Sequence, residues 1–264
     1  MPSTGTYGVD LAAQPKKTAV CMIEWFEDGR GRVDCPGHGA SDDEILNQMT
    51  RDDVSVSAID APFGWPIAFA ESLLDYAAHG SWPDPPGVQL TQQAMRLRAT
   101  DRAVYQETKL TPLSVSTDKI GVVAMRCARL LAAYWQAIGQ LPDRSGMGGV
   151  VEVYPAAALV QWGISQRSGV SDPGSYKGNS SAAAARRVRI LEAIASAAPW
   201  LEINEKVRVV CAESDDCLDA MICALVARAY ELDRILPIAD SAAAHAEGWI
   251  HLPTREPLDV LGPI

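Results

Sequence analysis

Thr6-Tyr7-Gly8-Val9-Asp10-Leu11-Ala12 and Val54-Ser55-Val56-Ser57-Ala58-Ile59-Asp60 are the two stretches that decide the fold. Both are short runs rich in apolar and β-favouring residues, so both are predicted to be strands. Each carries an aspartate at or near its end, although strands disfavour this residue. The two acidic strand ends are therefore the first candidates for a functional site.

The segment between these strands predicts the order of the remaining elements. A second strand is expected over residues 17–25, and a turn-rich link leads to a weaker third strand around residues 32–35. Ser41 and Glu44 have the spacing of a capping box, which predicts a helix over residues 42–49. The first sixty residues thus predict three neighbouring strands, a helix and a fourth strand.

Beyond the fourth strand the pattern is mainly helical. A short buried strand is expected at residues 150–155, where Pro155 ends the strand by opening a helix. Residues 166–181 are polar and rich in Gly and Ser, so we expect a surface loop or a lid. We predict one domain over residues 1–264 with an inserted helical region around residues 67–145. Further helices are predicted at residues 67–78, 100–106, 119–138, 182–197 and 214–231.

Composition limits the classes of protein. The chain has 264 residues, 48% of them apolar, and a formal net charge of −10. No apolar stretch reaches membrane-spanning length and the first residues do not resemble a secretory signal, so we expect a soluble, cytoplasmic protein with no membrane partner. The six cysteines include no C-x-x-C pair and are expected to be buried free thiols. The acidic charge argues against a general nucleic-acid coat and leaves any polyanion to a local patch or to bound metal.

Four carboxylates are expected to meet in space. Asp10 and Asp60 end two strands that would be parallel neighbours, while Asp216 and Asp219 lie three apart on one side of a predicted helix. Several carboxylates beside a core need a cation to neutralise them, and hard oxygen ligands favour Mg²⁺ or Mn²⁺. We therefore predict a metal centre with catalytic carboxylates, to which Glu152, at the end of another strand, adds a fifth candidate.

Each of these residues also has a structural interpretation. Asp60 precedes Ala61-Pro62 and would suit a turn, and Asp216 would suit the first turn of a helix, where the helix dipole favours acids. Asp10 is harder to explain in this way, because no turn signal is near it.

Three further residues are candidate substrate contacts. Arg98 and Asp101 are spaced to pair with each other, and Arg98 would also be free to reach a phosphate. Lys177 lies in the Gly/Ser-rich loop, from which it would swing over the site. A surface pair and a solvated lysine are the alternatives. The cluster Arg186, Arg187 and Arg189 is the best candidate for a nucleic-acid backbone patch, against the alternative of a solvated helix face.

The chain also resembles a known family. The motifs that carry the resemblance are Gly8-Val9-Asp10-Leu11-Ala12, Ile59-Asp60-Ala61-Pro62-Phe63-Gly64-Trp65-Pro66, Arg98-Ala99-Thr100-Asp101, Glu152-Val153-Tyr154-Pro155, Ser175-Tyr176-Lys177, Asp216-Cys217-Leu218-Asp219 and Glu247-Gly248-Trp249-Ile250-His251-Leu252-Pro253. Together they resemble the domain of unknown function 429 family, whose members are described as predicted nucleases of the ribonuclease H fold. The resemblance implies an α/β fold with a ribonuclease H-like mixed five-stranded sheet, flanked by helices and carrying helical insertions.

The acidic residues resemble a second pattern, the catalytic set of RuvC-type junction resolvases. That set has an acid on the first strand, another on the fourth and a D-x-x-D pair on a helix, matched here by Asp10, Asp60, Asp216 and Asp219. In those enzymes the fourth-strand acid is Glu, whereas this chain has the shorter Asp60.

Three functions follow as hypotheses. The first is a two-metal phosphodiesterase or nuclease acting on structured or single-stranded nucleic acid or on a small phosphate. The second is an actin-like or sugar-kinase-like phosphotransferase, although Leu11 and Ala12 stand where such enzymes have glycines. The third is a non-catalytic binding protein that keeps the acidic cluster as a structural or interaction site. The sequence leaves the oligomeric state open.

Overall fold

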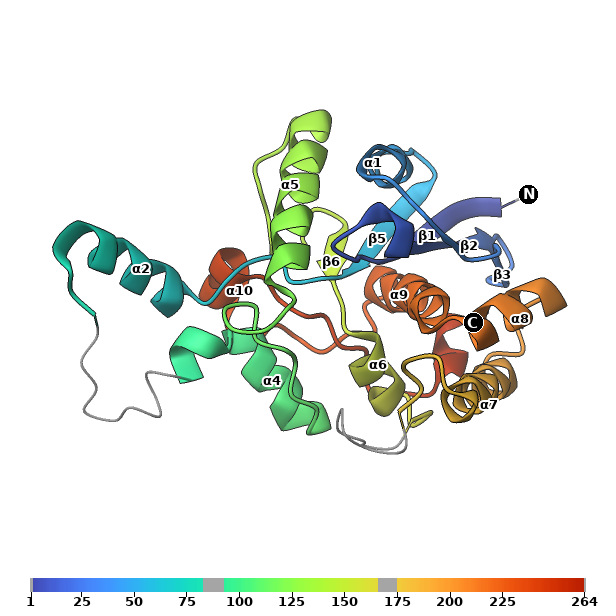
Figure 1. Cartoon of the computed structure of the whole chain (residues 1–264). Helices are drawn as coiled ribbons and strands as arrows, with labels where there is room; N and C mark the ends of the chain where they lie inside the picture. Colours follow the sequence, from blue (N-terminus) through green and yellow to red (C-terminus); the bar gives the residue numbers. More distant parts are fainter. Residues whose placement is uncertain (1, 83–92, 166–174, 264) are drawn as a thin grey trace.

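A mixed sheet forms the centre of the fold in the computed structural model, which describes residues 2–82, 93–165 and 175–263 (Figure 1). Over these residues the sheet has seven strands in the order β6-β5-β1-β2-β3-β7, with β4 paired to β2. The strands are β1 (Pro2–Asp10), β2 (Ala19–Phe26), β3 (Gly31–Val33), β4 (Gly37–His38), β5 (Val54–Asp60), β6 (Val150–Glu152) and β7 (Leu201–Glu202).

The pairing directions show how the sheet is connected. β1 runs antiparallel to β2 and parallel to β5, and β5 runs parallel to β6. β3 is antiparallel to β2 and parallel to β7. The five predicted strands are all present and the α/β class is confirmed. The expected number of five strands is wrong, because the two-residue strands β4 and β7 extend the sheet.

Helices surround the sheet. They are α1 (Asp42–Met49), α2 (Ile67–His79), α4 (Ala99–Thr108), α5 (Gly121–Ile138), α6 (Pro155–Gln161), α7 (Ser181–Ala197), α8 (Glu205–Glu213), α9 (Asp215–Glu231) and α10 (Ser241–Glu247), with short 3₁₀ turns at Pro15–Lys17 and Leu258–Leu261. The capping box of Ser41 and Glu44 is present at the start of α1, and Pro155 occupies the first turn of α6. Both predicted helix starts are therefore confirmed.

The two faces of the sheet are covered differently. α9 packs across β1, β2 and β5 on one face, while α1 and α5 lie over the other (Figure 1). Most of α9 is buried, and the contact is close at Gly8. A Cβ atom there would lie 2.0 Å from the carbonyl oxygen of Ala220, so only glycine lets the helix approach β1 at this distance. This contact fixes α9 against the strand that ends at Asp10.

The region between β5 and β6 contains α2, α4 and α5. α5 packs into the core through Cys127, Leu130 and Leu131. α2 instead extends away from the sheet and exposes apolar side chains such as Leu74, which is 70% exposed (Figure 1). Among the described residues, the predicted helical insertion thus contains the core helix α5, the projecting helix α2, and α4, which packs through Val104 into a smaller apolar cluster.

All six cysteines are free, and five are buried while Cys35 is half-buried. Within the described residues, every helix is too short or too polar to cross a lipid bilayer.

Candidate metal centre

Asp10 and Asp60 are neighbours on adjacent strands. They are the last residues of β1 and β5, and they are partners in the parallel register of these strands. Alternate residues of a strand share a face, so Asp10 points to the same side as Gly8, the side covered by α9. The local order of the sheet thus brings together two carboxylates that are 50 positions apart, as predicted.

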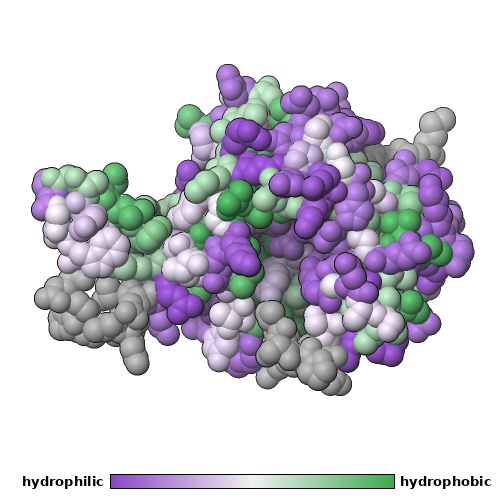
Figure 2. All heavy atoms as spheres, in the orientation of Figure 1, coloured by the Kyte–Doolittle hydropathy of each residue, from purple (hydrophilic) through white to green (hydrophobic). Residues whose placement is uncertain are grey.

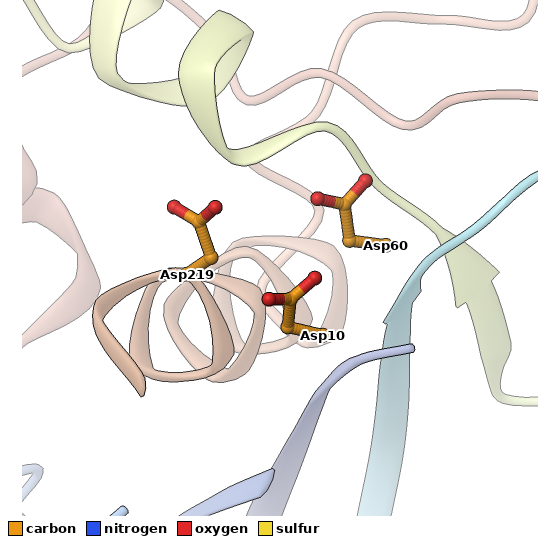
Figure 3. A group of neighbouring side chains, drawn as sticks. All are labelled: Asp10, Asp60 and Asp219. Carbon is orange, nitrogen blue, oxygen red and sulfur yellow. The ribbon is translucent and has the colours of Figure 1, made fainter. Parts of the chain in front are cut away.

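Asp219 of α9 completes the group (Figure 3). One carboxylate oxygen from each of Asp10, Asp60 and Asp219 lies within 4.8 Å of the other two. Figure 3 shows the three side chains pointing toward one another from two strand ends and a helix. Three hard oxygen donors at this spacing fit a divalent cation such as Mg²⁺ or Mn²⁺, and they do not provide the sulfur or imidazole ligands typical of zinc sites.

The ionised forms of the carboxylates are destabilised by burial and by one another. Burial, followed by the charges of Asp219 and Asp60, raises the pKa of Asp10 well above its usual value. Burial also raises the pKa of Asp60, to about 7, and the charge of Asp219 adds to this. Like charges in a low-dielectric site disfavour ionisation of all members. A bound cation would reverse this effect, so the site is suited to exchange a proton for a metal ion.

Both oxygens of Asp219 already have partners. The hydroxyl of Tyr176 donates to Oδ1 at 2.8 Å, and the ammonium of Lys177 contacts Oδ2. Asp219 is fully buried, whereas the Lys177 side chain is 45% exposed. Lys177 therefore lies at the site as predicted, but its ammonium neutralises a carboxylate. Its proposed contact with a substrate phosphate stays a prediction.

Asp216 lies outside this group of three. Its carboxylate is 39% exposed, and its Oδ2 is 4.0 Å from Nδ1 of His38. It lies one helical turn before Asp219, near the end of β4, and the metal-sized group contains Asp219 alone from α9. The expectation that both members of the D-x-x-D pair act as ligands is thus met geometrically only for Asp219.

Glu152 and Arg98 form an internal ion pair. Nη1 and Nη2 of Arg98 donate to the two carboxylate oxygens of Glu152 at 2.9 and 2.7 Å, and the backbone amide of Phe63 donates to Oε2 at 3.0 Å. The carboxylate of Asp101 accepts hydrogen bonds from Nε and Nη2 of the same guanidinium. All three side chains are at most 2% exposed. The expected Arg98–Asp101 contact is present, but these groups already satisfy one another. Roles for Glu152 as a ligand, or for Arg98 and Asp101 in substrate binding, stay predictions.

The predicted arginine patch on α7 is divided. Arg187 is 1% exposed and donates to four backbone carbonyl oxygens, those of Tyr176, Gly178, Ala212 and Glu213. It therefore holds the segment that carries Lys177, and it does not face a ligand. Arg189 is exposed. The interpretation of this cluster as a backbone-binding patch is wrong for Arg187, because its guanidinium is buried and four of its five N–H donors bond to the protein's own carbonyls.

A pocket of about 800 Å³ opens beside the carboxylates. It is lined by Asp10, Asp60 and Lys177, and Figure 2 shows it as a hollow in the centre of the face, between α4, α5 and α6 of Figure 1. Tyr154 also lines it. The Tyr154 hydroxyl has no hydrogen-bond partner among the described residues, and burial and Asp60 raise its pKa to about 12.

Sequence reasoning missed Tyr154 and Tyr176 as site residues. Tyr154 follows a strand end by two positions and immediately precedes the helix-opening Pro155, a location typical of functional residues in α/β proteins. That signal was available. The contact of Tyr176 with Asp219 depends on a loop of the tertiary structure and had no local signal.

Comparison with known proteins identifies the family. Searches of curated proteins and of solved structures give no match. A family model described as "Protein of unknown function (DUF429)" matches residues 8–244, a range that contains all three clustered carboxylates. The predicted membership of the domain of unknown function 429 family is thereby confirmed. Since the match covers most of the chain, this protein belongs to the DUF429 family of proteins of unknown function.

Proposed function

We propose that the protein is a metal-dependent phosphodiesterase of the nuclease type, with a ribonuclease H-like core. The observation that carries the proposal is the convergence of Asp10, Asp60 and Asp219 beside an open pocket. Three separate elements supply these side chains, so their meeting is a property of the whole fold. Buried carboxylates without an equal number of cations are costly, which argues for a function that uses them.

The strand order supports the same proposal. The five strands of three or more residues lie in the order β3-β2-β1-β5-β6, and among them β2 alone runs antiparallel to the others. This order is the one expected for a ribonuclease H core. In this arrangement β1 and β5, the first and fourth strands of the core, are parallel neighbours, and their ends carry Asp10 and Asp60. The fold by itself supports the class of protein, and the acidic site supports the activity.

Magnesium or manganese would be held by Asp10, Asp60 and Asp219, where it would polarise a phosphoryl oxygen and lower the pKa of a bound water. The protein contributes fixed ligand positions. Two strand ends orient Asp10 and Asp60, and the hydroxyl of Tyr176 orients Asp219. Lys177 supplies a positive charge at the same place.

The proposed reaction is hydrolysis of a phosphodiester. A water oxygen forms a bond to phosphorus, the bond from phosphorus to one ester oxygen breaks, and that oxygen leaves as a hydroxyl. One proton is lost by the water and one is gained by the leaving oxygen, so the reaction needs only water as a co-substrate. We assign to Tyr154 the role of donating its hydroxyl hydrogen to a phosphate oxygen, because it lines the pocket near Asp60 and has no internal hydrogen-bond partner among the described residues.

The contact between Lys177 and Asp219 favours a second candidate, a non-catalytic binding protein. The Lys177 ammonium neutralises one of the three carboxylates, and the raised pKa values of Asp10 and Asp60 favour their protonated forms, so the fold can balance this charge without a metal. A phosphodiesterase hydrolyses its substrate, whereas a non-catalytic binding protein binds a metal or ligand without hydrolysing a phosphodiester. The phosphotransferase hypothesis differs from both in requiring ATP.

The test uses Asp10→Asn beside an exposed control, Asp53→Asn, with Mg²⁺ or Mn²⁺. The substrates are single-stranded, duplex and branched DNA and RNA, together with small phosphodiesters. We expect wild type and Asp53→Asn to bind Mn²⁺ and hydrolyse at least one substrate, while Asp10→Asn does neither. Cleavage by Asp10→Asn at the wild-type rate would remove the proposal.

Two other results would support the alternatives. Binding of Mn²⁺ by wild type without turnover of any phosphodiester would support the non-catalytic candidate. Micromolar binding of a non-hydrolysable ATP analogue in a titration would support the phosphotransferase.

A further inference from the structure

The pocket beside the carboxylates has two chemically different parts. Its charged part contains Asp10, Asp60 and Lys177. The remaining wall is largely apolar and is formed by Leu110, Leu113, Ile120, Val123, Val160 and Ile250. These residues come from the ends of α4, α5 and α6 and from the segment after α10, so four parts of the chain enclose one apolar volume. Apolar side chains do not provide favourable contacts for a phosphate, which is a charged group.

The size of the pocket is that of a small-molecule site. Its volume of about 800 Å³ lies within the range of pockets that enclose a single organic ligand. Asp10 and Asp60 line the pocket and are half-buried, and the fully buried Asp219 lies behind them. A reacting phosphate therefore has to enter the pocket, with any group attached to it.

The positive charges near the pocket are few and local. Of the basic residues that line it, Arg98 is fully buried between Glu152 and Asp101. The other two are Lys109, whose ammonium donates to the carbonyl of Gln106, and Lys177, whose half-exposed side chain contacts Asp219, so a phosphate has to compete with these contacts. Arg187, expected in a nucleic-acid patch, donates to backbone carbonyls. Binding to a long polyanion depends on many phosphate contacts along a basic track, and the net charge of −10 opposes it. Two ammonium groups suit a ligand with one or two phosphates.

We propose that the substrate of this site is a small phosphate ester with an apolar or aromatic group, about one or two nucleotides in size, and not a long nucleic acid. The phosphate lies at the three carboxylates and Lys177, and the apolar group lies against the wall formed around Leu110 and Val160. Tyr154 lies where the two parts meet and donates to the phosphate. This inference rests on the proposed phosphodiesterase function and specifies its substrate class.

Binding tests the apolar part without requiring turnover. Thymidine 5′-monophosphate and inorganic phosphate are titrated separately into wild-type protein with Mg²⁺, and we expect the nucleotide to bind at least about tenfold more tightly. Equal affinities would overturn the inference, because the wall would then contribute nothing.

A matched pair of variants locates the binding. Leu113→Gln changes a leucine that lines the pocket and is 50% exposed, and Leu74→Gln changes one on α2 that is 70% exposed and lies outside it. Both side chains are partly in solvent, so both variants should keep the wild-type melting temperature within a few degrees. We expect Leu113→Gln to weaken nucleotide binding about fivefold and to leave Mn²⁺ affinity unchanged, while Leu74→Gln changes neither. Equal effects of the two variants would contradict the proposed position.

Turnover separates this inference from the function on which it rests. The rate of hydrolysis of the dinucleotide thymidylyl-(3′→5′)-thymidine is compared with internal cleavage of a single strand and of a duplex, which have the same leaving group, and the small ester should have a kcat/KM at least about a hundredfold higher. Faster cleavage of either polymer would overturn the substrate class and leave the phosphodiesterase proposal intact. Hydrolysis of none of them, with no Mn²⁺ binding, would overturn both.

Discussion

Arg98 and Glu152 are joined by two hydrogen bonds in the interior, from Nη1 to Oε2 at 2.9 Å and from Nη2 to Oε1 at 2.7 Å. Asp101 shares the same guanidinium, and all three groups are almost completely buried. This ion pair links the segment before α4 to the end of β6, and it lies in the wall of the pocket beside the carboxylates. Its first consequence concerns stability.

Replacing Arg98 with Met should strongly destabilise the fold, because two buried carboxylates would lose their cation. We expect the free energy of unfolding to fall by about 4 kcal/mol in urea titrations. Arg30→Met is the control, since Arg30 pairs with Asp28 at the surface with side chains 67% and 52% exposed, and its loss should change the free energy of unfolding far less. Equal losses in the two variants would show that the buried pair is not special.

Replacing Gly8 with Ala should disturb both stability and metal binding. The new Cβ would lie 2.0 Å from the oxygen of Ala220 and 2.4 Å from the nitrogen of Ala224, both of which belong to the backbone of α9. The helix must shift, so we expect a loss of about 3 kcal/mol and weaker Mn²⁺ binding, because Asp219 moves with α9. Gly37→Ala, where a Cβ meets nothing within 4 Å, should change unfolding by less than about 0.5 kcal/mol. Unchanged Mn²⁺ affinity in Gly8→Ala would argue that Asp219 is not a ligand.

Replacing Lys177 with Met should strengthen metal binding in the absence of substrate. The ammonium contacts Asp219 and has to be displaced by an incoming cation. We expect the dissociation constant for Mn²⁺, measured by calorimetry, to fall about tenfold. Lys109→Met is the control, because its ammonium donates to the carbonyl of Gln106 and lies 5.6 Å from the Tyr105 ring centre. Weaker Mn²⁺ binding by Lys177→Met would contradict the competition.

Metal affinity should rise with pH. Burial and Asp219 raise the pKa of Asp60 to about 7, so below this pH an incoming ion has to displace a proton. We expect Mn²⁺ affinity to increase between about pH 5 and pH 7 and to level off above, with Asp60→Asn reducing the dependence. A flat profile in wild type would contradict the raised pKa.

The same proton stabilises the metal-free fold. The folded pKa of Asp60 exceeds its ordinary value of 3.8, so the folded state binds the proton more tightly than the unfolded state. The contribution is fully present below about pH 4 and is lost as the pH rises toward about 7. In a chelator, the free energy of unfolding of wild type should therefore fall over this range more steeply than that of Asp60→Asn.

The positions of Asp10 and Asp60 were predictable from local sequence. An aspartate at the end of an apolar run marks a strand end, and parallel neighbours bring such ends together. Asp219 followed from helical periodicity. The same periodicity predicts Asp216 beside it, but residues three apart lie about a turn apart along the helix axis, and Asp216 is outside the group of three. Its role as a ligand stays a prediction.

Other features depended on tertiary contacts. Arg98 offered a sequence signal for a partner at Asp101, but its second partner, Glu152, is distant in sequence and comes within reach only when the fold brings the start of α4 to the end of β6. β4 and β7 have two residues each and are too short for any periodicity. α8 was predictable in principle, since Asn204 caps it by accepting from the amide of Val207, but its apolar pattern is weak.

Arg187 connects the segment around Lys177 to the C-terminal end of α8. Its guanidinium donates hydrogen bonds to backbone carbonyls on both sides of Lys177 and also to the carbonyls at the C-terminal end of α8. The reach of the lysine toward Asp219 is thereby set by a remote anchor. An event that loosened the helical layer formed by α7 and α8 would release this tether and change the charge at the carboxylates, without any alteration of the carboxylates themselves.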